Sequence, residues 1–177
     1  YLAIRKRSAF APALVVALLI AAMPTTHVGI LGWVRRQRGP VEEGWVEVHD
    51  VSRARGVLLR AGDAAELASA KKYVSLALKP DETWFDFTNR AIFYYLLNRQ
   101  NPTRYVEVAY YESEAAQRDV IATLERNPKI RAALVPPGGT AVDGVPHELR
   151  APLVWQYLQQ HFTPDFEEGG VVFWRRR

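Results

Sequence analysis

The stretch Leu78–Tyr105 reads LKPDETWFDFTNRAIFYYLLNRQNPTRY and contains the two kinds of segment from which an α/β fold is built. Thr83–Phe87 (TWFDF) is short, rich in aromatic residues and preceded by the turn signal KPD, so we predict a strand. The following residues TN are helix-capping types, and AIFYYLL is apolar on every face, which predicts a buried helix over Arg90–Asn98. A strand that leads directly into a helix is the repeating unit of parallel sheets.

Strand-like and helix-like patterns alternate on both sides of this stretch. Period-two alternation and short apolar runs indicate strands, whereas apolar residues at helical spacing and capping residues indicate helices. We predict further strands at Trp45–Asp50, Gly56–Arg60, Tyr105–Val108, Ile130–Val135 and Val171–Trp174, and helices over Asp63–Leu78, from Ser113 to about Leu124, and from Leu149 to about Phe162.

This order of elements is typical of βαβ units, in which right-handed crossovers place helices on both faces of a sheet. The sequence therefore predicts an α/β fold in which a three-layer, mostly parallel α/β sheet of about five strands is covered by helices. The first and last strands are expected to form an antiparallel edge. Pro136-Pro137-Gly138-Gly139-Thr140 lacks the Gly-Lys-Ser/Thr ending of a phosphate-binding loop and is interpreted as a turn.

The first forty residues have a different character. Ala9–Met23 is apolar throughout apart from Pro12, and apolar residues continue beyond it to Val34. A membrane-spanning helix needs about 20 residues, so a span from about Ala9 to Leu31 is possible, with basic residues on both flanks. A signal peptide or signal anchor fits the same pattern, and a buried helix of a soluble protein is a third alternative. We expect a transmembrane helix within residues 1–38 and an extracytoplasmic α/β domain over 39–177.

The distribution of charge argues against nucleic acid as a partner. Residues 1–38 carry six basic and no acidic side chains, so the other 139 residues carry 17 basic against all 19 acidic groups. A mildly acidic domain lacks the basic face that would neutralise phosphates along a duplex. The expected partner is the lipid bilayer, although three basic residues on each side of the apolar stretch leave its orientation undecided.

No metal or cofactor is expected. Cysteine is absent, which excludes disulfides and thiolate ligands within the chain. The four histidines, His27, His49, His147 and His161, are scattered without metal-ligand spacing. There is no nucleophile elbow and no serine beside a base, so no hydrolase is indicated and no catalytic residue is assigned.

Two groups of polar residues are candidates for ligand binding. Ligands of parallel sheets bind beyond the carboxyl ends of the strands, where Asp86 and Asn89 are expected to converge with Val108–Ser113. Asp86 alternatively accepts hydrogen bonds from the following backbone and caps the next helix. The second group, Arg99, Asn101, Thr103 and Arg104, is expected at the opposite end of the sheet. Its arginines would either clamp a phosphate or, in a solvated turn, pair with Glu107 or Asp86.

Four segments together resemble a known family: Leu78–Tyr105 quoted above, AAQRDVIATLERNPKIRAALV, PLVWQYLQQHF and the closing VVFWRRR. They are similar to the C-terminal extracytoplasmic domain of polytopic GT-C type glycosyltransferases, the superfamily of dolichyl-phosphate-mannose protein mannosyltransferase-like and aminoarabinose transferase-like enzymes. The resemblance covers about residues 60 to 177. Its most distinctive piece is Tyr94–Leu97 followed by Arg99 and Asn101–Arg104.

The resemblance implies that the chain is the end of a longer membrane enzyme, which transfers a sugar from a polyprenyl-phosphate donor on the periplasmic or extracytoplasmic side. Its partners would be the remainder of that enzyme and a glycan or lipid-linked acceptor. The catalytic residues of such enzymes lie in loops between early membrane helices, so none is expected here. The alternatives are a membrane-anchored ligand-binding or adaptor domain without enzymatic activity, and a secreted binding protein with its leader attached.

Overall fold

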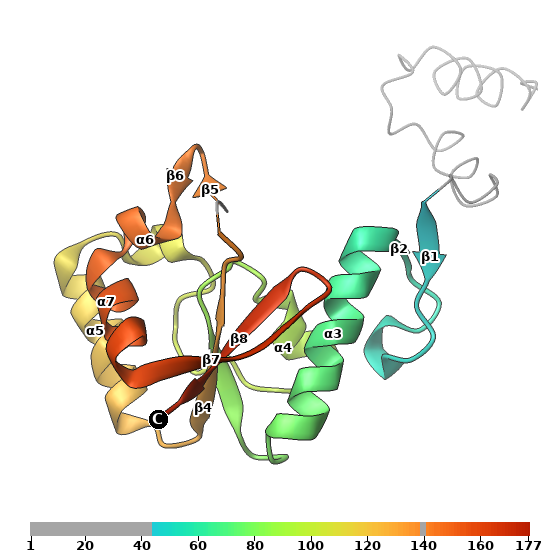
Figure 1. Ribbon diagram of the computed structural model, residues 1–177, viewed down its shortest axis with the longest axis horizontal. Helices are drawn as coiled ribbons and strands as arrows, with labels where there is room; N and C mark the ends of the chain where they lie inside the picture. Colours follow the sequence, from blue (N-terminus) through green and yellow to red (C-terminus); the bar gives the residue numbers. More distant parts are fainter. Residues whose placement is uncertain (1–43, 139–140) are drawn as a thin grey trace, which may run out of the picture. The chain divides into compact units, whose positions relative to one another are not determined.

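The computed structural model describes residues 44–138 and 141–177, which form a mixed α/β fold (Figure 1). The predicted transmembrane helix lies outside these residues. Among the described residues, no helix combines the length and the apolar character needed to cross a bilayer. The bounds of the helices and strands are β1 Trp45–Glu47, η1 Ser52–Ala54, β2 Leu58–Arg60, α3 Ala61–Ala77, β3 Thr83–Asp86, α4 Ile92–Leu96, η2 Val108–Tyr111, α5 Glu114–Arg126, β4 Ile130–Val135, β5 Ala141–Val142, β6 Val145–Pro146, α6 His147–Arg150, α7 Pro152–His161, β7 Phe162–Glu168 and β8 Val171–Arg176.

The central sheet has four strands in the order β3-β4-β8-β7. Only β3 and β4 run parallel, whereas β8 is antiparallel to both of its neighbours. The prediction of a mostly parallel sheet of about five strands is therefore wrong. The reason is local, because α7 passes directly into β7 and a tight turn then joins β7 to β8 as a hairpin, which can only be antiparallel.

That turn also explains why two consecutive glycines occur at its tip. Gly169 and Gly170 both have positive φ angles, of 56° and 83°. A Cβ atom on Gly169 would lie 2.3 Å from the Ser69 hydroxyl oxygen and 3.0 Å from the Ala65 carbonyl oxygen of α3. Glycine therefore allows the β7–β8 hairpin to approach α3 closely.

Three of the predicted strands do not belong to the central sheet. Trp45–Asp50 and Gly56–Arg60 contain β1 and β2, which pair only with each other, so the first strand does not form an edge of the central sheet. Tyr105–Val108 is not a strand. Its carbonyl at Tyr105 and its amide at Val108 bond to the side chains of Asn101 and Asn89 instead of to another strand.

Helices cover both faces of the sheet, so the predicted three layers are confirmed. Alternate residues of each strand point to opposite faces. One core contains Trp84, Leu134 and Phe173, packed by α3 and α4. The other contains Phe85 and Ala133 and is packed by α5 and α7.

Three predicted helices are present in the structure. The helix predicted over Asp63–Leu78 corresponds to α3, the one from Ser113 to α5, and the one ending near Phe162 to α7. The Ser113 hydroxyl accepts a hydrogen bond from the Ala116 amide, as predicted.

The predicted buried helix over Arg90–Asn98 is only partly confirmed. α4 is limited to the single turn Ile92–Leu96, and Ile92 and Tyr95 are each 60% exposed. Phe93 and Tyr94 are buried. This apolar segment covers the open edge of β3 and is not enclosed by the core on every side, so Ile92 and Tyr95 remain in solvent.

Tyr94 supplies the hydrogen bonds that a neighbouring strand would otherwise give to β3. Its hydroxyl donates to the Trp84 carbonyl over 2.9 Å and also contacts the backbone N–H of Asp86. Its ring stacks on the Trp84 indole with 4.6 Å between centroids. Unpaired backbone groups on an edge strand are costly when buried and promote aggregation when exposed, and this single side chain satisfies two of them.

We predict that Tyr94→Phe lowers the free energy of unfolding by about 1–3 kcal/mol, because it leaves buried backbone groups of β3 without a partner. The matched control is Tyr95→Phe, which removes an exposed hydroxyl from the neighbouring residue. Urea denaturation of both variants measures the difference. Equal stability of the two variants would contradict this role of Tyr94.

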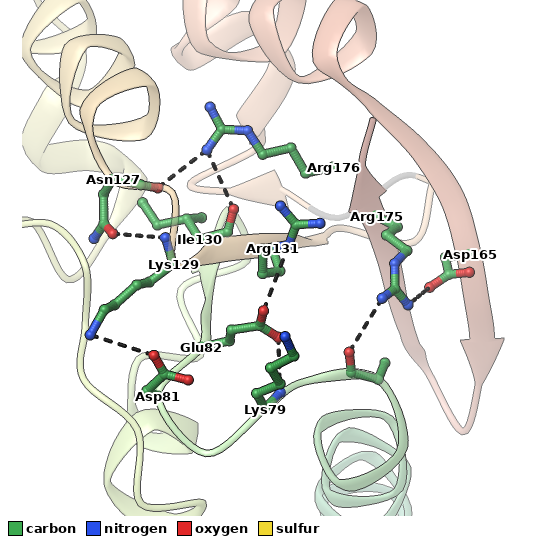
Figure 2. Close-up of polar contacts among 11 residues, drawn as sticks. Lys79, Asp81, Glu82, Asn127, Lys129, Ile130, Arg131, Asp165, Arg175 and Arg176 are labelled. Atoms are coloured by element: carbon green, nitrogen blue, oxygen red, sulfur yellow. Dashed lines mark hydrogen bonds and ion pairs between the residues drawn. The ribbon is translucent and has the colours of Figure 1, made fainter.

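The three arginines that close the sequence each bond to the end of a different helix, two of them drawn in Figure 2. Arg175 donates to the Ala77 carbonyl of α3 over 3.5 Å, Arg176 to the carbonyls at the end of α5, and Arg177 to the Gln160 carbonyl of α7 over 2.8 Å. The last carbonyls of a helix lack intrahelical donors and carry the negative end of the helix dipole. Strand β8 thereby holds the helices of both layers through charge-assisted bonds.

Arg176 is the most strongly engaged of the three, with Leu124, Asn127 and Ile130 carbonyls as acceptors at 2.9, 3.2 and 3.5 Å. We predict that Arg176→Met lowers the free energy of unfolding by about 1–3 kcal/mol. Arg118→Met is the control, because Arg118 pairs only with Glu114 on the same helix surface and its loss should cost less than about 0.5 kcal/mol. Thermal and urea unfolding of both variants test the contrast.

Candidate functional site

Asp86 ends β3 at the edge where parallel strands usually bind ligands. Its Oδ1 accepts hydrogen bonds from the backbone N–H and the hydroxyl of Thr88, over 2.8 and 2.6 Å. Its Oδ2 is shielded from solvent and has no hydrogen-bond partner among the described residues. Burial raises the pKa of Asp86, although the bonds from Thr88 and the positive charge of Arg90 act in the opposite direction. The alternative is confirmed only in part: Asp86 accepts the backbone N–H of Thr88, but it does not cap the next helix, because α4 begins at Ile92 without a side-chain cap.

Asn89 joins the two stretches that were expected to converge. It has a left-handed backbone with φ of 63°, and its Oδ1 accepts the Val108 amide over 2.7 Å. The adjacent Arg90 forms a bidentate pair with Glu66 of α3, at 2.8 and 2.6 Å. Both oxygens of Glu66 are therefore occupied, and this end of the sheet is closed by internal bonds.

The polar turn between α4 and η2 has the same self-contained character. Asn101 donates to the Tyr105 carbonyl over 3.0 Å and accepts the Thr103 amide over 3.1 Å. The Thr103 hydroxyl also donates to the Tyr105 carbonyl. The Thr83 hydroxyl ties the turn to β3 by donating to the Gln100 carbonyl over 2.8 Å.

Arg99 and Arg104 do not form a phosphate clamp. Arg104 lies on the surface, stacks over Tyr105 and pairs with Asp119 of α5 at 3.3 Å, so the predicted pairing with Glu107 or Asp86 is wrong. Arg99 donates to the Asn98 carbonyl over 3.3 Å, and its Nε is shielded from solvent without an acceptor among the described residues. The two side chains share no partner.

Two buried polar residues beside this region were missed by the sequence analysis. His147 is fully buried, and its Nδ1–H donates to the Phe87 carbonyl over 2.9 Å, whereas its Nε2 has no partner among the described residues. The Tyr111 hydroxyl is likewise buried and unpaired among them. Burial and the charge of Asp86 raise the pKa of Tyr111. No local sequence signal marks either residue, because their burial depends on elements distant in the chain.

An apolar groove of about 540 Å³ lies between β1 with its following loop and α3. A stripe of α3 that includes Ala64, Ala68 and Leu76 forms one wall, and residues 46–51 form the other. Lys71 bridges the two walls by donating to the Asp50 carbonyl over 2.7 Å. The volume of the groove is within the range of small-molecule sites. None of the predicted binding residues lines the groove.

The described residues contain no group of three or more His, Asp or Glu side chains that could hold a metal ion. Comparison of the chain with protein-family models, with characterised protein sequences and with solved structures finds no match. The family resemblance stated above therefore stays a prediction.

The raised pKa of Asp86 predicts how stability depends on pH. The folded chain binds this proton more tightly than the unfolded chain, so the contribution of Asp86 to stability is lost as pH rises from about 3.9, its ordinary pKa, through its folded value. Asp86→Asn keeps an oxygen for Thr88 and cannot ionise. We expect the stability of this variant relative to the wild type to increase with pH.

Urea denaturation between pH 4 and pH 8 measures this difference. Asp143→Asn, at an exposed turn, is the control and should show no such trend. A difference between Asp86→Asn and the wild type that stays constant or shrinks with rising pH would contradict burial as the dominant influence on Asp86.

Proposed function

We propose that this chain is the non-catalytic C-terminal extracytoplasmic domain, with the last membrane helix, of an integral-membrane glycosyltransferase that uses a polyprenyl-phosphate-linked sugar. The proposal combines the family resemblance with the apolar stretch Ala9–Leu31. In this proposal the bilayer and the remainder of the enzyme are the partners, and a glycan or lipid-linked acceptor is the ligand. The domain's main role is to stabilise the enzyme on the far side of the membrane.

One observation carries the stabilising role. The polar residues on which the resemblance depends bond to the domain's own backbone, as Asn101 does to Tyr105 and Asn89 does to Val108. Their hydrogen-bonding capacity is spent on fixing the segment that covers β3. Such a motif stabilises the fold of the domain. It does not need to contain a catalytic residue.

Arg104 is the exception within the motif. Its side chain is 73% exposed, and its partners Tyr105 and Asp119 are partly exposed. A cation stacked on a tyrosine ring presents both charge and an aromatic face, which suits contact with a sugar or phosphate of an acceptor. We therefore assign acceptor contact to Arg104 and structural roles to Asn89 and Asn101.

The groove between β1 and α3 favours the second candidate, a membrane-anchored domain that binds a ligand without enzymatic activity. The sequence upstream of Tyr1 distinguishes the two candidates. Several further membrane spans support the glycosyltransferase, whereas a start a few residues upstream supports the anchored binding domain.

Two variants of the intact membrane enzyme test the division of roles. Asn101→Ala should reduce the amount of folded enzyme, because the Tyr105 carbonyl loses a partly buried hydrogen bond, and leave transfer per folded molecule unchanged. Arg104→Ala should leave the amount of folded enzyme close to wild type and reduce transfer by about tenfold, the loss of one charge-assisted contact.

The measurements are the yield of folded enzyme by size-exclusion chromatography in detergent and the rate of sugar transfer from a polyprenyl-phosphate donor. Equal losses of yield and of transfer in Arg104→Ala would remove the assignment of Arg104 to the acceptor. An intact protein without any transfer activity would remove the proposed function.

A further inference from the structure

Two arginines that lie far apart in the sequence contact the same residue, Asn98, just after the end of α4. Arg53 of η1 donates to the Tyr95 carbonyl over 2.8 Å and to the Asn98 Oδ1 over 2.6 Å. Arg99 donates to the Asn98 backbone carbonyl over 3.3 Å. Asn98 is therefore the residue that both arginines have in common.

The positive charges of this pair are not neutralised within the described part of the chain. The hydrogen-bond acceptors of Arg53 and Arg99 are neutral oxygens, and no described carboxylate lies within ion-pair distance of either side chain. By contrast, Arg90 and Arg104 each have an acidic partner. Arg99 is only partly exposed, so its charge is less screened by water than that of a surface arginine.

Apolar surface adjoins Arg53. Arg53 stacks over the Tyr95 ring, with 4.9 Å from its Cζ to the ring centroid. Ile92 lies one helical turn before Tyr95 on the same face of α4, and both side chains are 60% exposed. A ligand at this place would meet two cationic forks and an apolar strip of one isoleucine and one tyrosine.

We propose that Arg53 and Arg99 form a binding site for a phosphate monoester or diester, which nothing in the family resemblance assigns. Guanidinium groups bind phosphate oxygens through paired hydrogen bonds, and two of them balance the charge of one phosphate dianion. The shared chemistry is the phosphate group, which could belong to a free phosphorylated metabolite or to a lipid headgroup whose acyl chains contact Ile92 and Tyr95. This site does not depend on the proposed glycosyltransferase function.

The test uses the full 177-residue chain in dodecyl maltoside micelles and isothermal titration calorimetry. The probes are inorganic phosphate and dihexanoyl phosphatidic acid, a short-chain lipid phosphate. We expect Arg53→Gln and Arg99→Gln each to weaken binding by at least about tenfold, which corresponds to one charge-assisted hydrogen bond.

The matched control is Arg126→Gln, which removes the same charge from an exposed arginine that also bonds only to a backbone carbonyl. Its binding should equal that of the wild type. Arg53→Lys checks the geometry, because it keeps the charge and loses the planar fork, and it should bind with intermediate affinity. Unfolding midpoints without ligand identify any variant that fails to fold.

Binding of both probes, lost in the two variants, supports recognition of phosphate as such. Binding of the lipid phosphate alone, lost in the same variants, supports a headgroup as the source. The absence of binding to either probe overturns the proposal, and so does an equal loss in Arg126→Gln or full binding by folded Arg53→Gln and Arg99→Gln.

Discussion

The backbone of β3 requires hydrogen-bond partners on its open side, and much of the structure follows from this requirement. β3 is an edge strand with β4 on one side only. The Tyr94 hydroxyl bonds to the Trp84 carbonyl on the open side, and the Thr83 hydroxyl bonds to Gln100. Satisfying these groups forces the segment after β3 to fold back along the strand. The bonds of Asn89 and Asn101 then fix the path of that segment.

The same need for hydrogen-bond partners applies to the C-terminal ends of the helices, whose last carbonyls lack donors. The closing arginines provide them, and each guanidinium group reaches a different helix. Basic residues that would look like a nucleic-acid patch in the sequence are therefore part of the internal architecture. This explains how a terminal cluster of three arginines is accommodated without a polyanionic partner.

Polar side chains that bond to the chain's own backbone differ from those that could still bind a ligand. Asp86, Asn89, Asn101 and Thr103 were selected from the sequence because polar residues at strand ends often bind ligands. In the folded chain they bond to nearby backbone. At the end of α4, Arg53 and Arg99 have only neutral acceptors among the described residues, and 45 residues separate Arg53 from the Asn98 that both contact. A pairing at that distance leaves no signal in the local sequence.

The sequence by itself determined the elements whose signals are local: the helices α3, α5 and α7, the strands β3, β4 and β8, and the Ser113 cap. Periodicity and capping chemistry act within a few residues, so they can be recognised without the fold. The tertiary structure decided the direction of β8, the short and half-exposed α4, the loss of Tyr105–Val108 as a strand, and the contact of both Arg53 and Arg99 with Asn98. These features depend on which backbone groups remain unpaired after the sheet has assembled, and that is a property of contacts between segments far apart in the chain.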